Sequence, residues 1–185
     1  MLYLRYSNNK GGNSYAVSGE VNRRISVEEK GQRAGRNPQA YIQPKQDALC
    51  TICGALYHNK RWYMDDSELQ KAGGDTAIQK VKCPACLMIE QGTPAAVVTL
   101  SGHYLKKHKA SIMDAIRNTE AHSRAKNPLG RIMEIKQEQD EISITTTEDK
   151  LAQKLGREIH KAHSGDLRYR WGHDENFVRV FWNRD

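Results

Sequence analysis

Two short stretches, Cys50-Thr51-Ile52-Cys53 and Cys83-Pro84-Ala85-Cys86, decide the fold of the middle of this chain. Both have C-x2-C spacing, and the 185 residues include no other cysteine. A C-x2-C turn directs two sulfur atoms at one point, and two such turns complete a tetrahedral site of four thiolates. Because thiolates suit zinc, we expect one structural Zn²⁺ held by Cys50, Cys53, Cys83 and Cys86.

Three other interpretations of the cysteines are a redox-active dithiol, an iron–sulfur cluster and free thiols in a core. The two matched pairs favour a closed metal site over all three. His58 lies between the pairs and could replace one cysteine as a ligand. Tyr57 to Tyr63 could form a small hairpin and Leu87 to Glu90 could start a helix. Residues 47–92 are therefore expected to form a treble-clef-like finger, with a zinc ribbon as the alternative.

Residues 93–185 have the pattern of a compact α+β unit. The predicted elements are a strand at 94–100, a helix after Gly102 that ends at Asn127-Pro128, strands at 131–136 and 142–146, a helix capped by Thr146 or Thr147 that ends at Gly165, and strands at 167–171 and 177–182. This order predicts a ferredoxin-like antiparallel sheet with two helices on one face.

Residues 1–46 are polar, contain several glycines and arginines, and have no sustained apolar period. Such a segment buries too little surface to offset the entropy of ordering it, so we expect a flexible basic arm. The arm is either a solvated tail or a segment that orders on RNA or on a partner. Its candidate nucleic-acid contacts are Arg23, Arg24, Arg33 and Arg36.

The net charge of +7 and the pI of about 9.2 favour a polyanionic partner, of which nucleic acid is the commonest. Further candidate contacts lie in the finger, on the first long helix and in the closing hairpin: Arg61, Trp62, Lys106, Lys107, Lys109, Arg117, Arg124, Arg168, Arg170 and Arg179. An ordinary solvated face is the alternative for the helix. In the hairpin, the regular alternation favours aromatic side chains pointing inward and arginines pointing outward.

Several function classes are not indicated. No apolar run approaches the roughly 18 to 20 residues that cross a membrane, and the N-terminus lacks the pattern of a secretory signal. We therefore expect a cytoplasmic protein. Since no nucleophile–base pair and no glycine-rich phosphate motif stands out, we expect neither catalysis nor a small-molecule substrate.

A resemblance to a known family rests on the cysteine pairs and on three later stretches: Arg131-Ile132-Met133-Glu134-Ile135-Lys136, Asp140-Glu141-Ile142-Ser143-Ile144-Thr145-Thr146-Thr147 and Lys150-Leu151-Ala152-Gln153-Lys154-Leu155-Gly156. These resemble nonsense-mediated decay protein three, the adaptor that accompanies the large ribosomal subunit out of the nucleus, and its archaeal relatives. This chain has one set of paired motifs where the adaptor has more, and it shows neither the adaptor's later domains nor an export signal. It is similar to a short bacterial-type relative. The resemblance implies binding to the large ribosomal subunit and does not imply nuclear export.

Together these features predict a non-enzymatic, zinc-containing factor that binds the ribosome or ribosomal RNA and acts in large-subunit assembly, quality control or dormancy. The first alternative is a DNA-binding or transcription-associated zinc protein. Two further alternatives are a thiol redox enzyme or metal hydrolase, and an adaptor whose basic arm binds an acidic protein.

Overall fold

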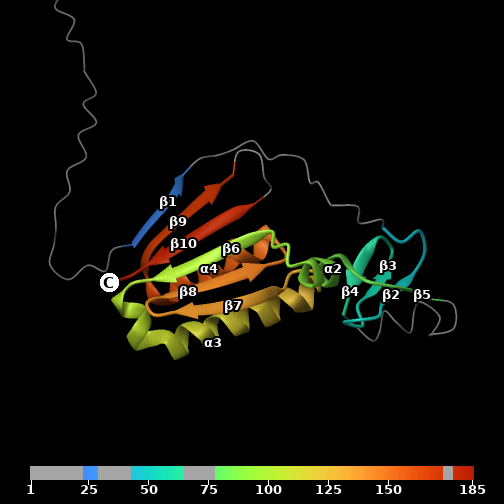
Figure 1. Ribbon diagram of the computed structural model, residues 1–185, viewed down its shortest axis with the longest axis horizontal. Coiled ribbons are helices and arrows are strands. Elements are labelled where there is room, and N and C mark those ends of the chain that lie inside the picture. Colours follow the sequence, from blue (N-terminus) through green and yellow to red (C-terminus); the bar gives the residue numbers. More distant parts are fainter. Residues whose placement is uncertain (1–22, 29–42, 65–77, 173–176) are drawn as a thin grey trace, which may run out of the picture.

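The computed structural model describes residues 23–28, 43–64, 78–172 and 177–185 (Figure 1). These residues form a small finger with a four-stranded sheet and a larger unit with a six-stranded sheet and two helices. The predicted α+β class is confirmed. None of the described helices combines the length and the apolar character needed to cross a membrane.

The larger sheet has the strand order β1-β9-β10-β6-β8-β7. Its strands are β1 (Arg23–Glu28), β6 (Ala96–Ser101), β7 (Ile132–Glu138), β8 (Glu141–Thr146), β9 (Gly165–Trp171) and β10 (Val178–Asn183). Neighbouring strands are antiparallel except for two pairs, β1 with β9 and β10 with β6, which are parallel.

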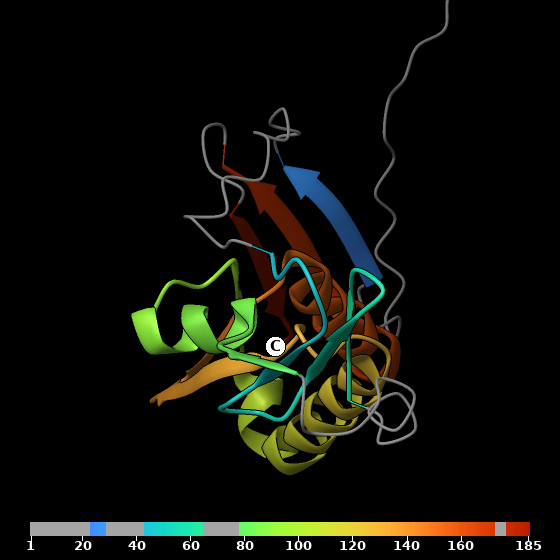
Figure 2. The ribbon, with the colours of Figure 1, turned by 90° about the vertical axis from the view of Figure 1, so that its right-hand side faces the viewer.

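Helices α3 (His103–Lys126) and α4 (Asp149–His163) lie on the same side of this sheet (Figure 2). Strands β6, β8 and β10 alternate between buried and partly exposed residues, which is the pattern of a sheet with one covered face. Ile116 from α3, Leu155 from α4 and Trp182 from β10 meet in the core between the layers. The opposite face of the sheet carries no described helix.

The order of the sheet departs from the predicted ferredoxin-like arrangement at one position. Strands β6, β8 and β7 have the predicted order and antiparallel directions, but β10 lies between β9 and β6 and runs parallel to β6. Burial fits the central place of β10, because both strands bury their core-facing residues but Arg179 and Phe181 of β10 are partly buried on the other face, where Arg168 and Arg170 of β9 are exposed. The more apolar strand of the closing hairpin takes the central place.

Strand β1 comes from the segment that the sequence predicts to be a flexible arm. It pairs with β9 from Arg23 opposite Gly165 to Glu28 opposite Arg170. For residues 23–28 the prediction of an arm is therefore wrong, because the open edge of β9 supplies backbone hydrogen bonds that the segment lacks alone. The rest of the arm, including Arg33 and Arg36, lies outside the described residues.

The finger begins with a four-stranded sheet in the order β4-β3-β2-β5. Its elements are β2 (Ala48–Cys50), β3 (Leu56–His58), β4 (Arg61–Tyr63), β5 (Gln79–Val81) and helix α2 (Pro84–Gln91). It has its own apolar cluster, which includes Ala48, Tyr57, Trp62 and the three buried cysteines. A cysteine turn, a hairpin and a helix follow one another, which is the order predicted for a treble-clef-like finger and not for a ribbon.

Candidate metal centre and basic surfaces

Two backbone turns place the four cysteines. Cys50 ends β2, and the Gly54 amide donates a hydrogen bond to the Cys50 carbonyl oxygen at 2.9 Å, which closes the first turn. Gly54 has φ of +73°, a conformation that glycine adopts without strain. Cys83 caps the N-terminus of α2, where its sulfur accepts a hydrogen bond from the Cys86 amide at 3.4 Å. Pro84 follows at the first helical position, which suits its fixed φ.

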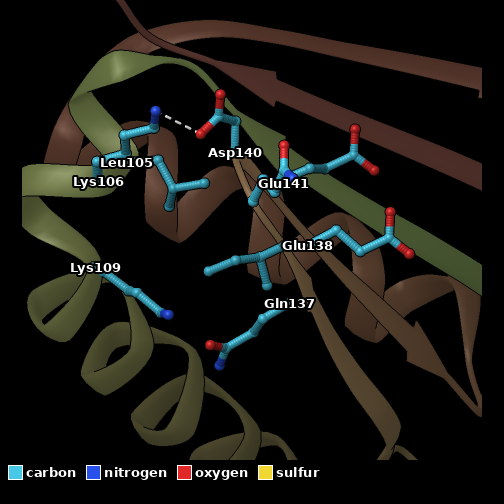
Figure 3. Close-up of a pocket in the computed structure, with 9 residues that line it drawn as sticks. Leu105, Lys106, Lys109, Gln137, Glu138, Asp140 and Glu141 are labelled. Carbon is cyan, nitrogen blue, oxygen red and sulfur yellow. Dashed lines mark ion pairs between the residues drawn. The ribbon is translucent and has the colours of Figure 1, made fainter.

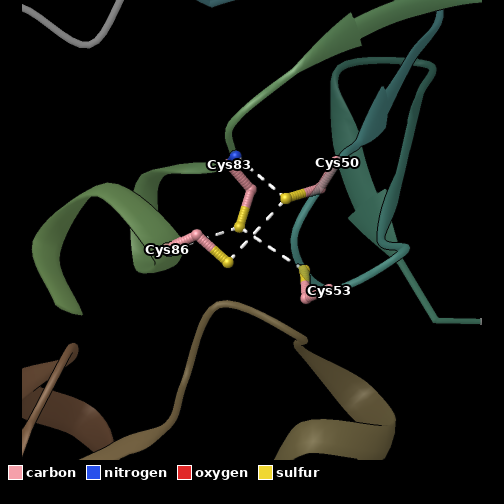
Figure 4. A group of neighbouring side chains, drawn as sticks. All are labelled: Cys50, Cys53, Cys83 and Cys86. Atoms are coloured by element: carbon pink, nitrogen blue, oxygen red, sulfur yellow. Dashed lines mark hydrogen bonds between the residues drawn. The ribbon is translucent and has the colours of Figure 1, made fainter. Parts of the chain in front are cut away.

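The four sulfur atoms converge on one point (Figure 4). The Sγ atoms of Cys50 and Cys86 are 3.8 Å apart, those of Cys53 and Cys83 are 3.7 Å apart, and all four lie within 4.8 Å of one another. Zinc–sulfur bonds of about 2.3 Å in a tetrahedron put neighbouring sulfurs about 3.8 Å apart. The donor set and its spacing therefore fit one metal ion.

His58 does not belong to this set. Its Nδ1 atom lies 2.8 Å from Oδ2 of Asp47, so its ring is held by a carboxylate instead of facing the sulfurs. The four cysteines are also free of disulfide bonds. A closed site of four sulfurs leaves no position for a substrate, which is typical of a structural metal centre.

Burial and hydrogen bonding shift the pKa values of the cysteine thiols in different directions. Burial raises the pKa of Cys83, and neighbouring thiolates add to the effect. Burial also raises the pKa of Cys86, although a hydrogen bond from Arg131 opposes it. Burial opposes ionisation of Cys50 too, but backbone amides, that of Cys83 first, outweigh it and lower its pKa to about 6. Since metal ligation needs thiolates, binding a metal must release protons from Cys83 and Cys86.

One residue that contacts the sulfurs, Arg131, is not among those predicted from the sequence. Arg131, immediately before β7 in the larger unit, directs its guanidinium at the cysteines. Its Nη2 lies 2.8 Å from Sγ of Cys53 and 3.7 Å from that of Cys83, and its Nη1 lies 3.3 Å from Sγ of Cys86. The sequence offers no signal for this contact, because a single arginine before a β-rich run is typical of an exposed strand end.

In the finger, the two predicted nucleic-acid contacts separate. Arg61 is exposed, whereas Trp62 is only 8% exposed and packs on Tyr57 with ring centroids 5.3 Å apart. The prediction that Trp62 contacts nucleic acid is wrong for this conformation, because a base cannot stack on a ring that is covered by the finger's own core.

Helix α3 exposes all of its predicted basic contacts: Lys106, Lys107, Lys109, Arg117 and Arg124. Acidic side chains accompany several of them, with Lys106 Nζ 2.5 Å from Oδ1 of Asp140 and Arg117 Nη1 3.4 Å from Oδ1 of Asp114. A hollow of about 430 Å³ between the start of α3 and the β7–β8 turn is lined by both signs of charge (Figure 3). Helix α3 alone therefore presents a mixed surface.

The uncovered face of the larger sheet is more strongly basic at one end. Tyr169 and Trp182 are buried beneath it, while Arg168 and Arg170 are exposed and Arg179 is partly exposed, as the alternation in the hairpin indicates. The strand register places Arg170 opposite Arg179 and Arg168 opposite Phe181. Arg179 is further fixed by Phe177, whose ring centroid lies 4.8 Å from its Cζ.

The same two rows continue across the sheet with small side chains. Val97 and Thr145 follow Arg179 in one row, and Thr99 and Ser143 follow Phe181 in the other. We call this face, from Arg168 and Arg170 to Thr145 and Ser143, the open face. The predicted contacts Arg23 and Arg24 lie in β1 at its edge, and their side chains are outside the described part of the chain.

Comparison of this chain with protein-family models, with curated proteins and with solved structures finds no match.

Proposed function

We propose that this protein is a non-enzymatic RNA-binding factor with one structural zinc ion, and that its target is ribosomal RNA of the large subunit. The observation that carries the proposal is the pairing of Arg170 with Arg179 and of Arg168 with Phe181 on the open face. Zinc holds the finger in shape and takes no part in a reaction.

The pairing of Arg170 with Arg179 favours an anionic ligand. Side chains directly opposite on antiparallel strands have Cβ atoms about 4.5–5.5 Å apart, and like charges in such positions destabilise a sheet. A phosphate group that reaches both guanidinium groups would accept charge-assisted hydrogen bonds from each of them. Glu28 of β1 lies opposite Arg170 on its other side, so it is the cluster of cations, and not an unpaired charge, that favours a polyanion.

Phe181 favours single-stranded RNA over a smooth duplex. It lies in the row beside the arginine pair, and its neighbours across β6 and β8 are the small residues Thr99 and Ser143. A sheet face with an aromatic ring between arginines and hydroxyl groups lets an unpaired base stack while its phosphates contact the arginines. Loops and bulges of folded RNA supply such bases, and ribosomal RNA is rich in them.

Zinc is the metal that the sulfur set favours. Four thiolates are soft ligands, their spacing fits a tetrahedron, and zinc needs no change of oxidation state to remain in a closed site. Elemental analysis of the purified full-length protein tests this directly, with one zinc per chain as the expected result. Stoichiometric iron, or no metal after purification without chelators, would contradict it.

Binding measurements with paired variants test the RNA proposal. Arg170→Glu with Arg179→Glu should weaken binding to an unpaired RNA oligonucleotide at least about 10-fold, and Phe181→Ala should weaken it about 5- to 100-fold through lost stacking. The matched control, Arg117→Glu with Arg124→Glu on α3, reverses the same number of charges on exposed positions and should have a smaller effect.

Duplex DNA is the competing ligand in the same assay. A salt-sensitive preference of the wild-type protein for duplex DNA would favour the DNA-binding alternative. For the ribosomal target, wild-type protein should co-sediment with large ribosomal subunits at low salt. The variant with Arg170→Glu and Arg179→Glu should remain at the top of the gradient. Equal sedimentation of wild type and variant would exclude the open face as the ribosome-binding surface.

A further inference from the structure

Arg131 belongs to the larger unit by its backbone and to the finger by its side chain. It is 7% exposed, and its guanidinium contacts the sulfurs of Cys53, Cys83 and Cys86, which lie 45 or more positions earlier in the chain. Contacts this buried between a permanent cation and three possible thiolates are not those of an ordinary surface arginine. They join the two units at the metal site itself.

The larger unit fixes the direction of this side chain independently of the sulfurs. Nε of Arg131 donates to the Pro128 carbonyl oxygen at 2.8 Å, and the Arg131 amide donates to Oγ1 of Thr147 at 2.8 Å. The Thr147 amide in turn donates to the Arg131 carbonyl oxygen at 3.0 Å. Leu129, from the same loop, packs against the apolar cluster of the finger. These contacts within the larger unit therefore orient the guanidinium toward the sulfurs.

Charge balance explains why the site needs such a residue. Four thiolates around a divalent ion carry a net charge of about −2, and burying an uncompensated charge is unfavourable. The hydrogen bonds from the guanidinium to Cys53 and Cys86 compensate part of it, and they also raise the pKa of Arg131 although its burial alone would lower it. Conversely, Arg131 would be a buried cation without an anionic partner if the sulfurs were protonated or withdrawn.

We propose that Arg131 orients and stabilises the sulfur ligands of the metal centre through hydrogen bonds from its guanidinium, and that it thereby couples metal binding in the finger to docking of the finger on the larger unit. This inference rests on the metal-binding part of the proposed function and is independent of RNA binding. A bound metal would fix the sulfurs in place beside the guanidinium, where Arg131 contacts three of them. Without the metal the sulfurs are not held together at this position, so the docked arrangement loses its main polar contact.

Zinc release from the full-length protein tests the orienting role of Arg131. Hydrogen bonds to the ligands of a metal contribute about 10- to 100-fold to metal affinity. Arg131→Met should therefore transfer zinc to a chromogenic chelator at least about 10-fold faster than wild type. The matched control is Arg117→Met, because Arg117 is exposed and distant in the chain from the cysteine turns. It should release zinc at the wild-type rate.

Cobalt substitution separates a direct contact from a general loss of stability. A hydrogen bond stabilises the sulfur donor orbitals, so its removal should move the sulfur-to-cobalt charge-transfer absorption to longer wavelength in Arg131→Met. Arg131→Lys keeps the charge without the planar fork, should shift the band less, and serves if the methionine variant does not fold. Wild-type release rates and wild-type spectra in both variants would overturn the proposal.

Hydrogen exchange tests the coupling itself. In the wild type, removal of zinc with a chelator should increase exchange at the amides of Arg131 and Thr147, which lie in the larger unit and are not metal ligands. Unchanged exchange there, with increased exchange in the finger, would show that metal binding and docking are independent. Wild-type protein that carries no metal would instead contradict the proposed zinc site and leave the RNA-binding experiments to be judged separately.

Discussion

At the scale of single residues, the environment of His163 predicts a pH-dependent stability in the acidic range. It is 8% exposed, lies at the end of α4, and its Nδ1 is 3.4 Å from the hydroxyl of Tyr104. Burial lowers its pKa below the ordinary 6.5, and the nearby charges of His108 and Arg184 lower it further. The unfolded chain therefore binds a proton at a pH at which the folded protein does not.

This difference sets the direction of the effect. The contribution of neutral His163 to stability is fully present above pH 6.5 and is lost as the pH falls from 6.5 through the lower pKa of the folded state. His163→Gln should make the free energy of unfolding less dependent on pH in this acidic range, as measured by denaturant titrations at several pH values. The control His122→Gln changes an exposed histidine of α3 and should keep the wild-type slope. An unchanged slope in His163→Gln would contradict the assignment.

Gly102 is a second residue with a measurable role, because it permits the close approach of the C-terminal segment to the start of α3. Its φ is +106°, and a Cβ at this position would lie 2.1 Å from the Arg184 carbonyl oxygen. Gly102→Ala should lower the free energy of unfolding by roughly 2–4 kcal/mol, since strain and a backbone clash combine. Gly92→Ala is the control, because Gly92 has φ of +63° with open space around it and should cost only about 1 kcal/mol. Equal losses in denaturant unfolding would contradict the clash.

Some residues of the candidate site could be predicted from the sequence and others could not. The cysteines were predictable because the chemistry of ligation imposes a spacing that is visible in the sequence. Arg131 was not, because its role depends on a fold that brings it to residues far away in the chain. The prediction that Thr146 or Thr147 caps α4 is wrong for the same reason: Glu148 is the N-cap residue, and both threonine hydroxyls donate to backbone oxygens instead.

Of the elements, the finger is the one whose folding we expect to depend most directly on the proposed metal ion. Cys83 both caps α2 and supplies a sulfur, so Cys83→Ser should remove the metal and unfold residues 47–92. Elemental analysis and proteolysis are the measurements, with loss of stoichiometric zinc and new cleavage sites in the finger as the expected results. Ile52→Ser is the control, because Ile52 is exposed within the first cysteine turn and is not a ligand. Full zinc retention in Cys83→Ser would contradict the four-sulfur site.

The elements were more predictable than their arrangement. Local periodicity and the breakers Gly102, Asn127-Pro128 and Gly165 indicate α3, α4 and the strands near their observed bounds, because these features act over a few residues. Strand β1 and the insertion of β10 between β9 and β6 depend on which edge is open once the sheet has formed. That information belongs to pairing between distant segments and has no local pattern.

At the scale of the whole molecule, two separate apolar cores predict two unfolding events. The core of the larger unit includes Leu100, Ile144 and Trp182 and shares no residue with the cysteine-containing core of the finger. The larger core does not contain a metal ligand, so its packing does not require the ion.

Calorimetry with and without a chelator tests this independence. Metal removal should abolish the transition of the finger and leave a cooperative transition of the larger unit at a modestly lower temperature, because the contact of Arg131 with the sulfurs is weakened. Trp182→Ala should instead lower the stability of the larger unit and leave the finger intact. It removes a completely buried side chain from the larger core, at a cost of about 3–5 kcal/mol, and should leave the zinc content unchanged. A single transition in which the chelator unfolds both units would show instead that the larger unit is not stable without the folded finger. The contact at Arg131 would then be required for the whole fold, and it would not couple two independently stable units.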